Sequence, residues 1–532
     1  MSRHPSRQTE WLTCVEYPDA DSLLEKLGGL PLALVQAGAY IGATSLTVKK
    51  YIRHYDKTWD KLMTYQDRYP LQEYAERSLL TTWRMSYEQV HVVKPQATRL
   101  LDLWAFLHPG DISYELIERF TRSLKGGEEA LERESIITDN LSFQDSVGVL
   151  AQHSLVDNSK GTGKFSINTV VHDWSLYNIV DDQAREQLCR QAIRMIAESI
   201  PSSKDSGNLQ MAQKLLPHAR VAAKRHIKMR EVANLEPELY QIACFMQDWE
   251  SSQEVEILYL RALRGYEKVL GAKHTSTLNP VNNLGLLYAS QGKLKDAEEM
   301  LIRALRGREE VLGARHMSTL STVNDLGNLY RDQGKIEEAE EMYLRALRGR
   351  EEAWGAKHTS TLNTVNNLAI LYADQGKMKE AEEMYLRALR GREEAWGAKH
   401  TSTLDTVNNL AVLYANQGKI KEAEEMYLRA LRGYEEAWGA KHTSTLDTMY
   451  NLGNLYRDQG EVVKAKDMYQ RAAEGYEDVE VDREAHILYI REQLSLLVAT
   501  DGEAERSCQP IGQQAPISSA GIPKRASLVP TL

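Results

Sequence analysis

A block of 42 residues repeats along the second half of the chain. Its clearest marker is the segment RALRG, which recurs with small changes; the copies begin at Arg261, Arg303, Arg345, Arg387, Arg429 and Arg471. A single unit of this length cannot bury its apolar face alone, whereas stacked copies can. The repeat therefore predicts a solenoid of about six units from residue 236 onward.

Each unit predicts a pair of amphipathic helices. Around Leu284, the first helix is expected from Thr275 to Ser290, with Thr275 or Ser276 as its N-cap. A Gln-Gly pair then breaks the helix, and the second helix is expected from Leu294 to Leu312. The fold class is therefore mainly α.

The fuller pattern resembles the tetratricopeptide repeat, in the form found in kinesin light chains. It is carried by NNLAxLYxxQGKxxEAExxYxRAL, which Asn366 to Leu389 matches almost throughout. The usual unit has 34 residues, and the extra eight amount to about one more turn per helix. The resemblance covers about half of the chain and implies a scaffold that binds proteins or peptides.

The N-terminal half does not repeat. Gly29 to Leu34 reads GLPLAL, in which Pro31 marks a helix start. Two further helices, a glycine turn at 161–163 and an alternating strand from Phe165 to Val171 predict a small helical domain with a β-wing. The triplet Val171-His172-Asp173 then starts the next helix.

GLPLAL, a winged helix and a V-H-D triplet follow one another in the ARC segments of NB-ARC proteins, the nucleotide-switched signalling ATPases that this region resembles. The resemblance implies that Pro31 packs near adenine and that His172 faces the phosphates of ADP; a structural role is the alternative for both. A P-loop needs G-x-x-x-x-G-K-[ST], and no such string occurs. We therefore expect no cofactor, or at most weak ADP binding.

These features divide the chain into five expected parts. They are an ARC-like helical segment (1–75), a winged-helix-like domain (76–180), a helical linker (181–235), the solenoid (236–499) and a disordered tail (500–532).

The first helices of the repeats are expected to line a concave groove, as in tetratricopeptide proteins. A spacing of four, three and four residues keeps one polar set on a single helix face. An asparagine amide can bond an extended peptide backbone through both its oxygen and its nitrogen; a solvated face is the alternative. The predicted partner-binding residues are Asn283, Asp325, Asn367, Asn409, Asn451, Asn363, Asp405 and Asp447. Their face carries aspartates and no basic residue, which favours a basic or neutral ligand.

Composition narrows the function further. The net charge of −10 argues against nucleic acid and anionic membranes as partners. Four widely spaced cysteines and the absence of a signal-peptide core fit a cytoplasmic protein. Five histidines and three tryptophans recur at repeat spacing and are interpreted as structural; they are His274, His316, His358, His400, His442, Trp354, Trp396 and Trp438. We expect no metal site and no catalysis.

The leading hypothesis is a non-catalytic interaction module, the sensor or scaffold part of an NLR-like signalling protein, with self-association as a further possibility. Two alternatives stay open. One is an ADP/ATP-switched signalling ATPase seen without its P-loop domain. The other is a kinesin light chain-like cargo adaptor, which would need a heptad coiled coil before the repeats.

Overall fold

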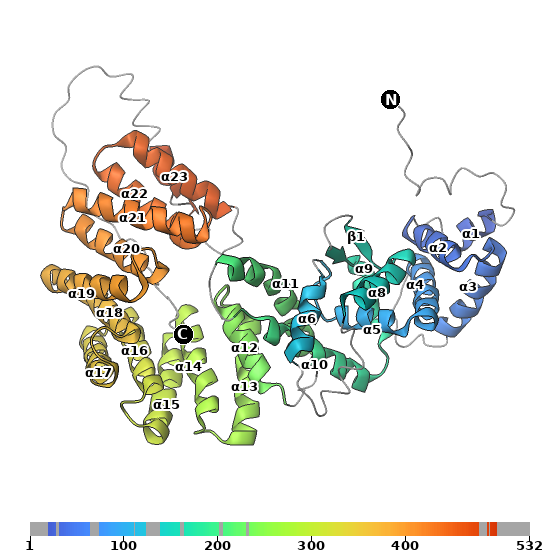
Figure 1. The fold of residues 1–532 in the computed structure, drawn as a ribbon, viewed down its shortest axis with the longest axis horizontal. Coiled ribbons are helices and arrows are strands. Elements are labelled where there is room, and N and C mark those ends of the chain that lie inside the picture. Colours follow the sequence, from blue (N-terminus) through green and yellow to red (C-terminus); the bar gives the residue numbers. More distant parts are fainter. Residues whose placement is uncertain are drawn as a thin grey trace, which may run out of the picture. The chain divides into compact units, whose positions relative to one another are not determined.

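The computed structural model describes residues 20–27, 31–63, 74–110, 112–123, 139–159, 164–201, 206–229, 234–477, 487–488 and 490–496. Contacts divide the chain into two compact units, residues 1–265 and 266–532 (Figure 1). The tail predicted to be disordered and the predicted glycine turn at 161–163 both lie outside the described residues. No described helix is long and apolar enough to cross a membrane.

In its described residues, the first unit consists of helices and one small hairpin. Its helices are α1 (Ala20–Lys26), α2 (Pro31–Thr44), α3 (Val48–Met63), α4 (Tyr74–Val93), α5 (Pro95–Trp104), α6 (Tyr114–Ser123), α8 (Asn140–Gln152), α9 (Thr169–Asn178), α10 (Asp182–Ser199), α11 (Ser206–Lys228), α12 (Glu236–Gln247) and the greater part of α13 (Gln253–Leu270).

Local sequence sets where several of these helices begin. Pro31 and Pro95 are the first residues of α2 and α5, where the missing N–H is not needed. Asp139 caps α8 by accepting a hydrogen bond from the Ser142 N–H at 2.8 Å. Asn168 caps α9 in the same way through the N–H of Val170.

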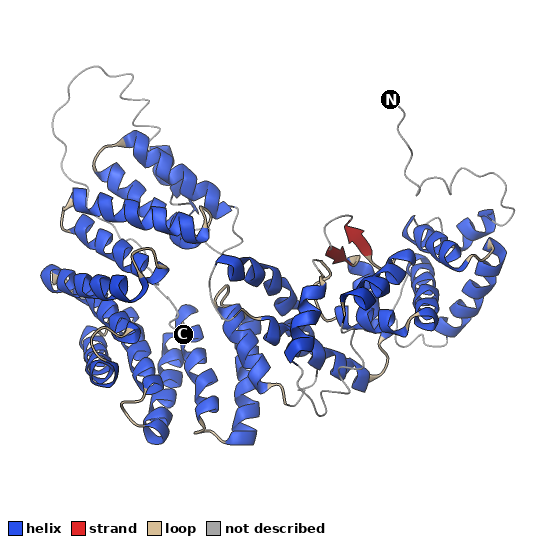
Figure 2. Ribbon diagram, viewed as in Figure 1, coloured by secondary structure: helices blue, strands red, loops and turns tan. Residues whose placement is uncertain are grey.

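Figure 2 shows the strands of this unit as one small hairpin among helices. Strands β1 (Asp157–Ser159) and β2 (Lys164–Ser166) pair antiparallel, and Ile112 adds an isolated bridge to Phe165. The order α5, bridge, α6, α8, hairpin agrees with the order expected of a winged helix, which itself stays a prediction.

One boundary in this region differs from the sequence-based expectation. The strand predicted to run from Phe165 to Val171 ends at Ser166, and α9 begins at Thr169. The Asn168 cap explains the difference, because its side chain satisfies a main-chain N–H of the first helical turn. Val171 and His172 therefore lie on a helix.

The second unit is a stack of helix pairs. The first helices are α14 (Thr275–Ser290), α16 (Met317–Asp332), α18 (Thr359–Asp374), α20 (Thr401–Asn416) and α22 (Thr443–Asp458). The second helices are α15 (Leu294–Leu312), α17 (Ile336–Trp354), α19 (Met378–Trp396), α21 (Ile420–Trp438) and α23 (Val462–Glu477). The bounds predicted for the unit around Leu284 are confirmed at both helices.

Small residues let the helices of this stack approach closely. At Gly391 on α19, an added Cβ would lie 2.6 Å from the Cδ2 atom of Leu362 on α18. Ala369, Ala381 and Ala388 are fully buried in the same part of the array. The recurring Gly and Ala of the sequence are therefore places where a neighbouring large side chain takes the space.

Candidate ligand-binding face

The first helices of the pairs form one continuous side of the array. Successive members contact each other: α14 with α16, α16 with α18, α18 with α20, and α20 with α22. In Figure 1, α16 and α18 lie on the inner side of the curve that the pairs follow, and α17 and α19 lie on the outer side. We call the side formed by α14, α16, α18, α20 and α22 the inner face.

A repeated histidine cap gives these five helices the same register. In each, the Nδ1 atom of a histidine accepts a hydrogen bond from the main-chain N–H two residues later, at 3.2 Å; these are His274, His316, His358, His400 and His442. The cap was expected at Thr275 or Ser276, and the structure places it one or two residues earlier. Trp396 and Trp438 contact His400 and His442, with ring centroids 4.7 and 4.0 Å apart.

In the N-terminal part of the inner face, the predicted binding residues form contacts with other residues of the array. Asp325 accepts a hydrogen bond from the Asn282 amide at 3.1 Å, and burial raises the pKa of this carboxyl. The Asn367 amide donates to the Asn328 oxygen at 3.2 Å. Asn283, half-buried on α14, also has a contact. Here the polar row joins one repeat to the next.

In the C-terminal part, two amides of the same row are not engaged in this way. Asn409 on α20 is half-buried and has no hydrogen-bond partner among the described residues. The Nδ2 atom of Asn451 on α22 is buried and likewise lacks a partner there. A buried donor without a partner is costly, and the half-buried Asn409 is the amide of this pair that solvent can reach.

The aspartates of this part contact tyrosines. Asp405 on α20 accepts a hydrogen bond from the Tyr434 hydroxyl at 2.5 Å, and Asp447 on α22 accepts one from Tyr476 at 2.5 Å. Burial is the main cause that raises the pKa of Asp405, against the lowering effects of Tyr434 and Arg392. Both aspartates are half-buried and therefore partly open to solvent.

Three arginines that the sequence patterns did not reveal reach this face from the second helices. Arg308, Arg350 and Arg392 are 7%, 4% and 5% exposed and bond residues of the first helices on either side. The expectation of a face without basic residues therefore needs correction. The sequence shows that the residue after RALRG is arginine in these three repeats and tyrosine in the next, but it does not show that this side chain reaches the first helices.

The contacts of Arg392 are typical of the three. Its guanidinium donates to the Asn363 oxygen on α18 at 2.6 Å, and to the Ser402 carbonyl and the Thr406 hydroxyl on α20 at 2.5 and 2.7 Å. Arg350 repeats this arrangement, and burial lowers its pKa to about 10. Asn363, predicted to bind a partner, is thus engaged by an arginine.

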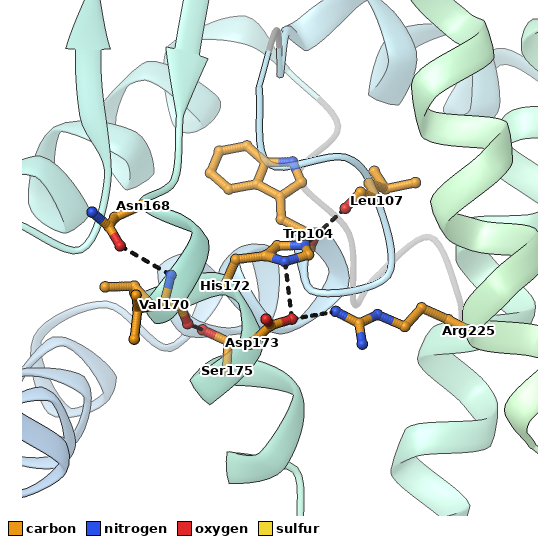
Figure 3. A network of polar contacts seen from close by, with 9 residues as sticks. Trp104, Leu107, Asn168, Val170, His172, Asp173, Ser175 and Arg225 are labelled. Atoms are coloured by element: carbon orange, nitrogen blue, oxygen red, sulfur yellow. Dashed lines mark hydrogen bonds and ion pairs between the residues drawn. The ribbon is translucent and has the colours of Figure 1, made fainter. Parts of the chain in front are cut away.

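In the first unit, His172 holds α9 against the end of α5 (Figure 3). Its buried Nε2–H donates to the carbonyl oxygens of Trp104 and Leu107, at 3.1 and 2.8 Å. Burial is the main cause that lowers its pKa. The neighbouring Asp173 pairs with Arg225 of α11 at 2.6 Å. These contacts fit the structural interpretation of His172; its role towards ADP stays a prediction.

Pro31 begins α2, and its side chain lies outside the part that the structure describes. The nucleotide role of Pro31 therefore stays a prediction. No described group of three or more His, Cys, Asp or Glu residues could hold a metal ion. A hollow of about 550 Å³ lies beside α11, and its lining residues are His108, Gly110, Ser166, Gln210, Gln213, Lys214, Pro217 and His218.

Comparison with known families assigns two regions. The tetratricopeptide repeat family matches at 241–310, 279–352, 317–394, 360–436 and 401–478. Residues 89–184 match a domain of unknown function, DUF7779. No curated protein matches the chain.

Among solved structures, a putative kinesin light chain of Podosopora anserina with nearly identical TPR-like repeats is 22% identical, with a TM-score of 0.34; the match covers 39% of this chain and 98% of that one. A signal transduction ATPase with numerous domains from Pyrococcus horikoshii, which has a tetratricopeptide repeat sensor, is 12% identical with a TM-score of 0.47; the match covers 85% of this chain and 66% of that one.

A third structure, NprR in complex with its cognate peptide NprX, is 18% identical with a TM-score of 0.37, and the match covers 53% of this chain and 77% of that one. All three TM-scores lie below 0.5, so these likenesses say nothing about what this chain binds. The repeats, in contrast, are shown by the family match and by the helix pairs. Residues 241–478 of this mainly helical chain are an array of tetratricopeptide repeats.

Proposed function

We propose that the chain is a non-catalytic interaction module that binds an extended segment of a partner protein on the inner face of its repeats. The observation that carries the proposal is the pair of amides on α20 and α22. Asn409 and Asn451 occupy one register position of neighbouring repeats, and neither the Asn409 amide nor the Asn451 Nδ2 has a partner among the described residues.

The chemistry of the amide explains what would bind there. An asparagine side chain offers two donors and an acceptor, which matches the alternating N–H and C=O groups of an extended peptide. A ligand backbone can reach the half-buried Asn409 amide directly. The buried Nδ2 of Asn451 must turn outward first, and its pairing with the ligand would remove the cost of about 1–3 kcal/mol of an unpaired buried polar group. The upstream amide of Asn367 gains less, because it already bonds within the array.

The wider role that we propose is the sensor or scaffold part of an NLR-like signalling protein. The order of GLPLAL, a small helical domain with a hairpin, V-H-D and a repeat array supports it. Within this proposal, His172 acts by holding α9 on α5, and the repeats recognise the partner.

The test begins with a library of random ten-residue peptides displayed on phage, selected on the immobilised full chain. An enriched peptide is synthesised, and its affinity is measured for the wild type and for Asn409→Ala combined with Asn451→Ala. We expect the double variant to bind about tenfold or more weakly, since each hydrogen bond contributes about 0.5–1.5 kcal/mol.

The matched control is Asn328→Ala combined with Asn367→Ala, which removes two amides that bond each other inside the array. We expect this variant to lose stability and to keep most of its affinity. Equal affinity of the wild type and Asn409→Ala/Asn451→Ala for every enriched peptide would contradict the proposal.

A further inference from the structure

A repeated pair of residues on the inner face exists in two versions of opposite charge. In each of the five helix pairs from α14–α15 to α22–α23, a residue of the second helix bonds the residue 29 positions before it on the first helix. Three repeats use arginine with a neutral partner, namely Arg308 with Asn279, Arg350 with Ser321 and Arg392 with Asn363. The two that follow use tyrosine with aspartate, namely Tyr434 with Asp405 and Tyr476 with Asp447.

The two versions occupy the same position of the repeat. The version present therefore determines the charge of this position, while the fold of the helix pair stays the same. An arginine with a neutral partner adds one positive charge, and a tyrosine with aspartate adds one negative charge. The last arginine of the series, Arg392, reaches forward as far as α20 and partly opposes the rise that burial causes in the pKa of Asp405 there. In the next repeat, Tyr434 stands at the position of Arg392. No arginine of this series therefore lies between α20 and α22 to neutralise the charge of Asp447.

The N-terminal repeats also contain aspartates on the inner face, but these do not cancel the positive charge of the three arginines. Asp325 accepts a hydrogen bond from Asn282, and both Arg308 and Arg350 act against the rise of its pKa. Asp332 pairs with Arg331 on the same helix at 2.9 Å. Asp325 and Asp332 therefore each have a cationic neighbour, and on α22 Asp458 pairs with Arg457 in the same way as Asp332 pairs with Arg331.

The two amides without a partner among the described residues lie at the same end as the tyrosine–aspartate pairs. Asn409 and Asp405 are one helical turn apart on α20, and Asn451 and Asp447 are one turn apart on α22. A ligand that bonds the two amides would therefore place its own side chains next to the two carboxylates. Aspartate side chains that are only half-buried attract cationic side chains of a partner.

We propose that the inner face is electrically polarised, and that it binds a peptide whose Lys or Arg residues lie over α20 and α22 while its neutral or acidic residues lie towards α14 to α18. This inference rests on the proposed function and specifies its ligand. The sequence analysis favoured a ligand that is basic or neutral along its whole length. The inference restricts the basic residues to one half of the ligand, because the arginines of the N-terminal repeats repel Lys and Arg.

Because the repeats are nearly identical, the residue pair of one repeat can be placed in another, which changes the charge at a chosen position of the inner face. The variant Tyr434→Arg with Asp405→Asn places an arginine pair in the α20–α21 repeat. The groups that the new arginine needs are present, because Ser444 and Thr448 stand where Arg392 finds Ser402 and Thr406. Arg392→Tyr with Asn363→Asp makes the opposite exchange, between pairs that the array already contains.

The experiment selects displayed ten-residue peptides on the full chain and then compares affinities for the enriched peptide. We expect enrichment of Lys and Arg in one half of the peptides. Tyr434→Arg/Asp405→Asn should weaken binding about tenfold at about 10 mM salt, and the gap should close at about 1 M, where the Debye length is about 3 Å. Arg392→Tyr/Asn363→Asp should tighten binding of the same peptide.

The control is Glu394→Gln with Glu436→Gln, which shifts the net charge by the same amount at exposed ion pairs between second helices and loops. It should leave the affinity unchanged. Enriched peptides without a basic bias, or an equal loss in control and swap, would overturn the polarised face. Failure of Asn409→Ala/Asn451→Ala to weaken any enriched peptide would instead overturn the proposed function, so the two failures are distinguishable.

Discussion

At the scale of single residues, asparagines at the same repeat position have different contacts along the array. The Asn367 amide donates to Asn328, which lies 39 residues earlier on α16. The residue 39 positions before Asn409 is Ile370, and the corresponding residue for Asn451 is Val412. An apolar side chain offers no acceptor, so the two later amides lack the partner that Asn367 has.

The sequence alone does not predict this difference. The row of asparagines is visible there, and so is the change from asparagine to isoleucine and valine. What the sequence does not show is that the two positions face each other across neighbouring repeats. That pairing depends on how one helix pair packs on the next.

The cap residue His442 predicts a pH dependence of stability. Its Nδ1 atom accepts a hydrogen bond from the Ser444 N–H, and burial lowers its pKa to about 4. The unfolded chain, with a histidine pKa of about 6.5, takes up the proton first. The stabilising contribution is therefore complete above about pH 6.5 and is lost as the pH falls towards about 4.

Urea unfolding of the wild type and of His442→Asn at several pH values checks this prediction. Asparagine also caps helices and does not titrate in this range. The variant should therefore lose less unfolding free energy than the wild type between about pH 7 and pH 5. Identical slopes for the two proteins would show that the cap does not titrate.

At the scale of elements, much of the array could be predicted from sequence. The bounds of α14 and α15 follow from glycines that punctuate every repeat, as at Gly292 and Gly313, whose φ angles are +74° and +88°. The arginines of the inner face could not be predicted in the same way. Their partners lie 29 residues away on another helix, and only packing brings them together.

The close approach of α18 and α19 predicts the effect of one methyl group. Gly391→Ala would place a Cβ 2.6 Å from the side chain of Leu362, and we expect a loss of about 1–3 kcal/mol from overpacking. Gly148→Ala on α8 is the matched control, because an added Cβ there would meet no atom within 4 Å apart from its own helix backbone. Calorimetry should show destabilisation for the first variant and none for the second.

The contact between α9 and α5 predicts that His172 matters for stability. His172→Ala leaves the carbonyls of Trp104 and Leu107 without this donor, at a cost of about 1–3 kcal/mol. Thermal melting with and without ADP separates this role from nucleotide binding. We expect ADP to leave the melting temperature of the wild type unchanged; an increase that disappears in His172→Ala would instead favour the nucleotide role.

At the scale of the whole array, ion pairs link each repeat to the next. Examples are Lys419 with Glu382 at 2.8 Å and Lys399 with Glu436 at 2.7 Å. Lys399 and Glu436 are largely exposed, so water and salt screen their attraction. The apolar contacts between neighbouring helices therefore contribute most of what holds the array together.

Removal of one exposed pair should accordingly change little. Lys399→Ala should leave the unfolding midpoint unchanged within error, because isolated surface pairs contribute little. Denaturant titration of the wild type and of Lys399→Ala at low and high salt measures the unfolding midpoint. A clear loss of stability at low salt alone would show that the ion pairs along the array act together.

The central claim is that the C-terminal part of the inner face receives a partner segment, and hydrogen–deuterium exchange tests it most directly. The full chain is compared with and without an enriched peptide at saturating concentration. We expect new protection of main-chain amides in α20 and α22, reduced in Asn409→Ala/Asn451→Ala at the same peptide concentration. Protection confined to the second helices α17, α19 and α21, or to the first unit, would contradict the claim.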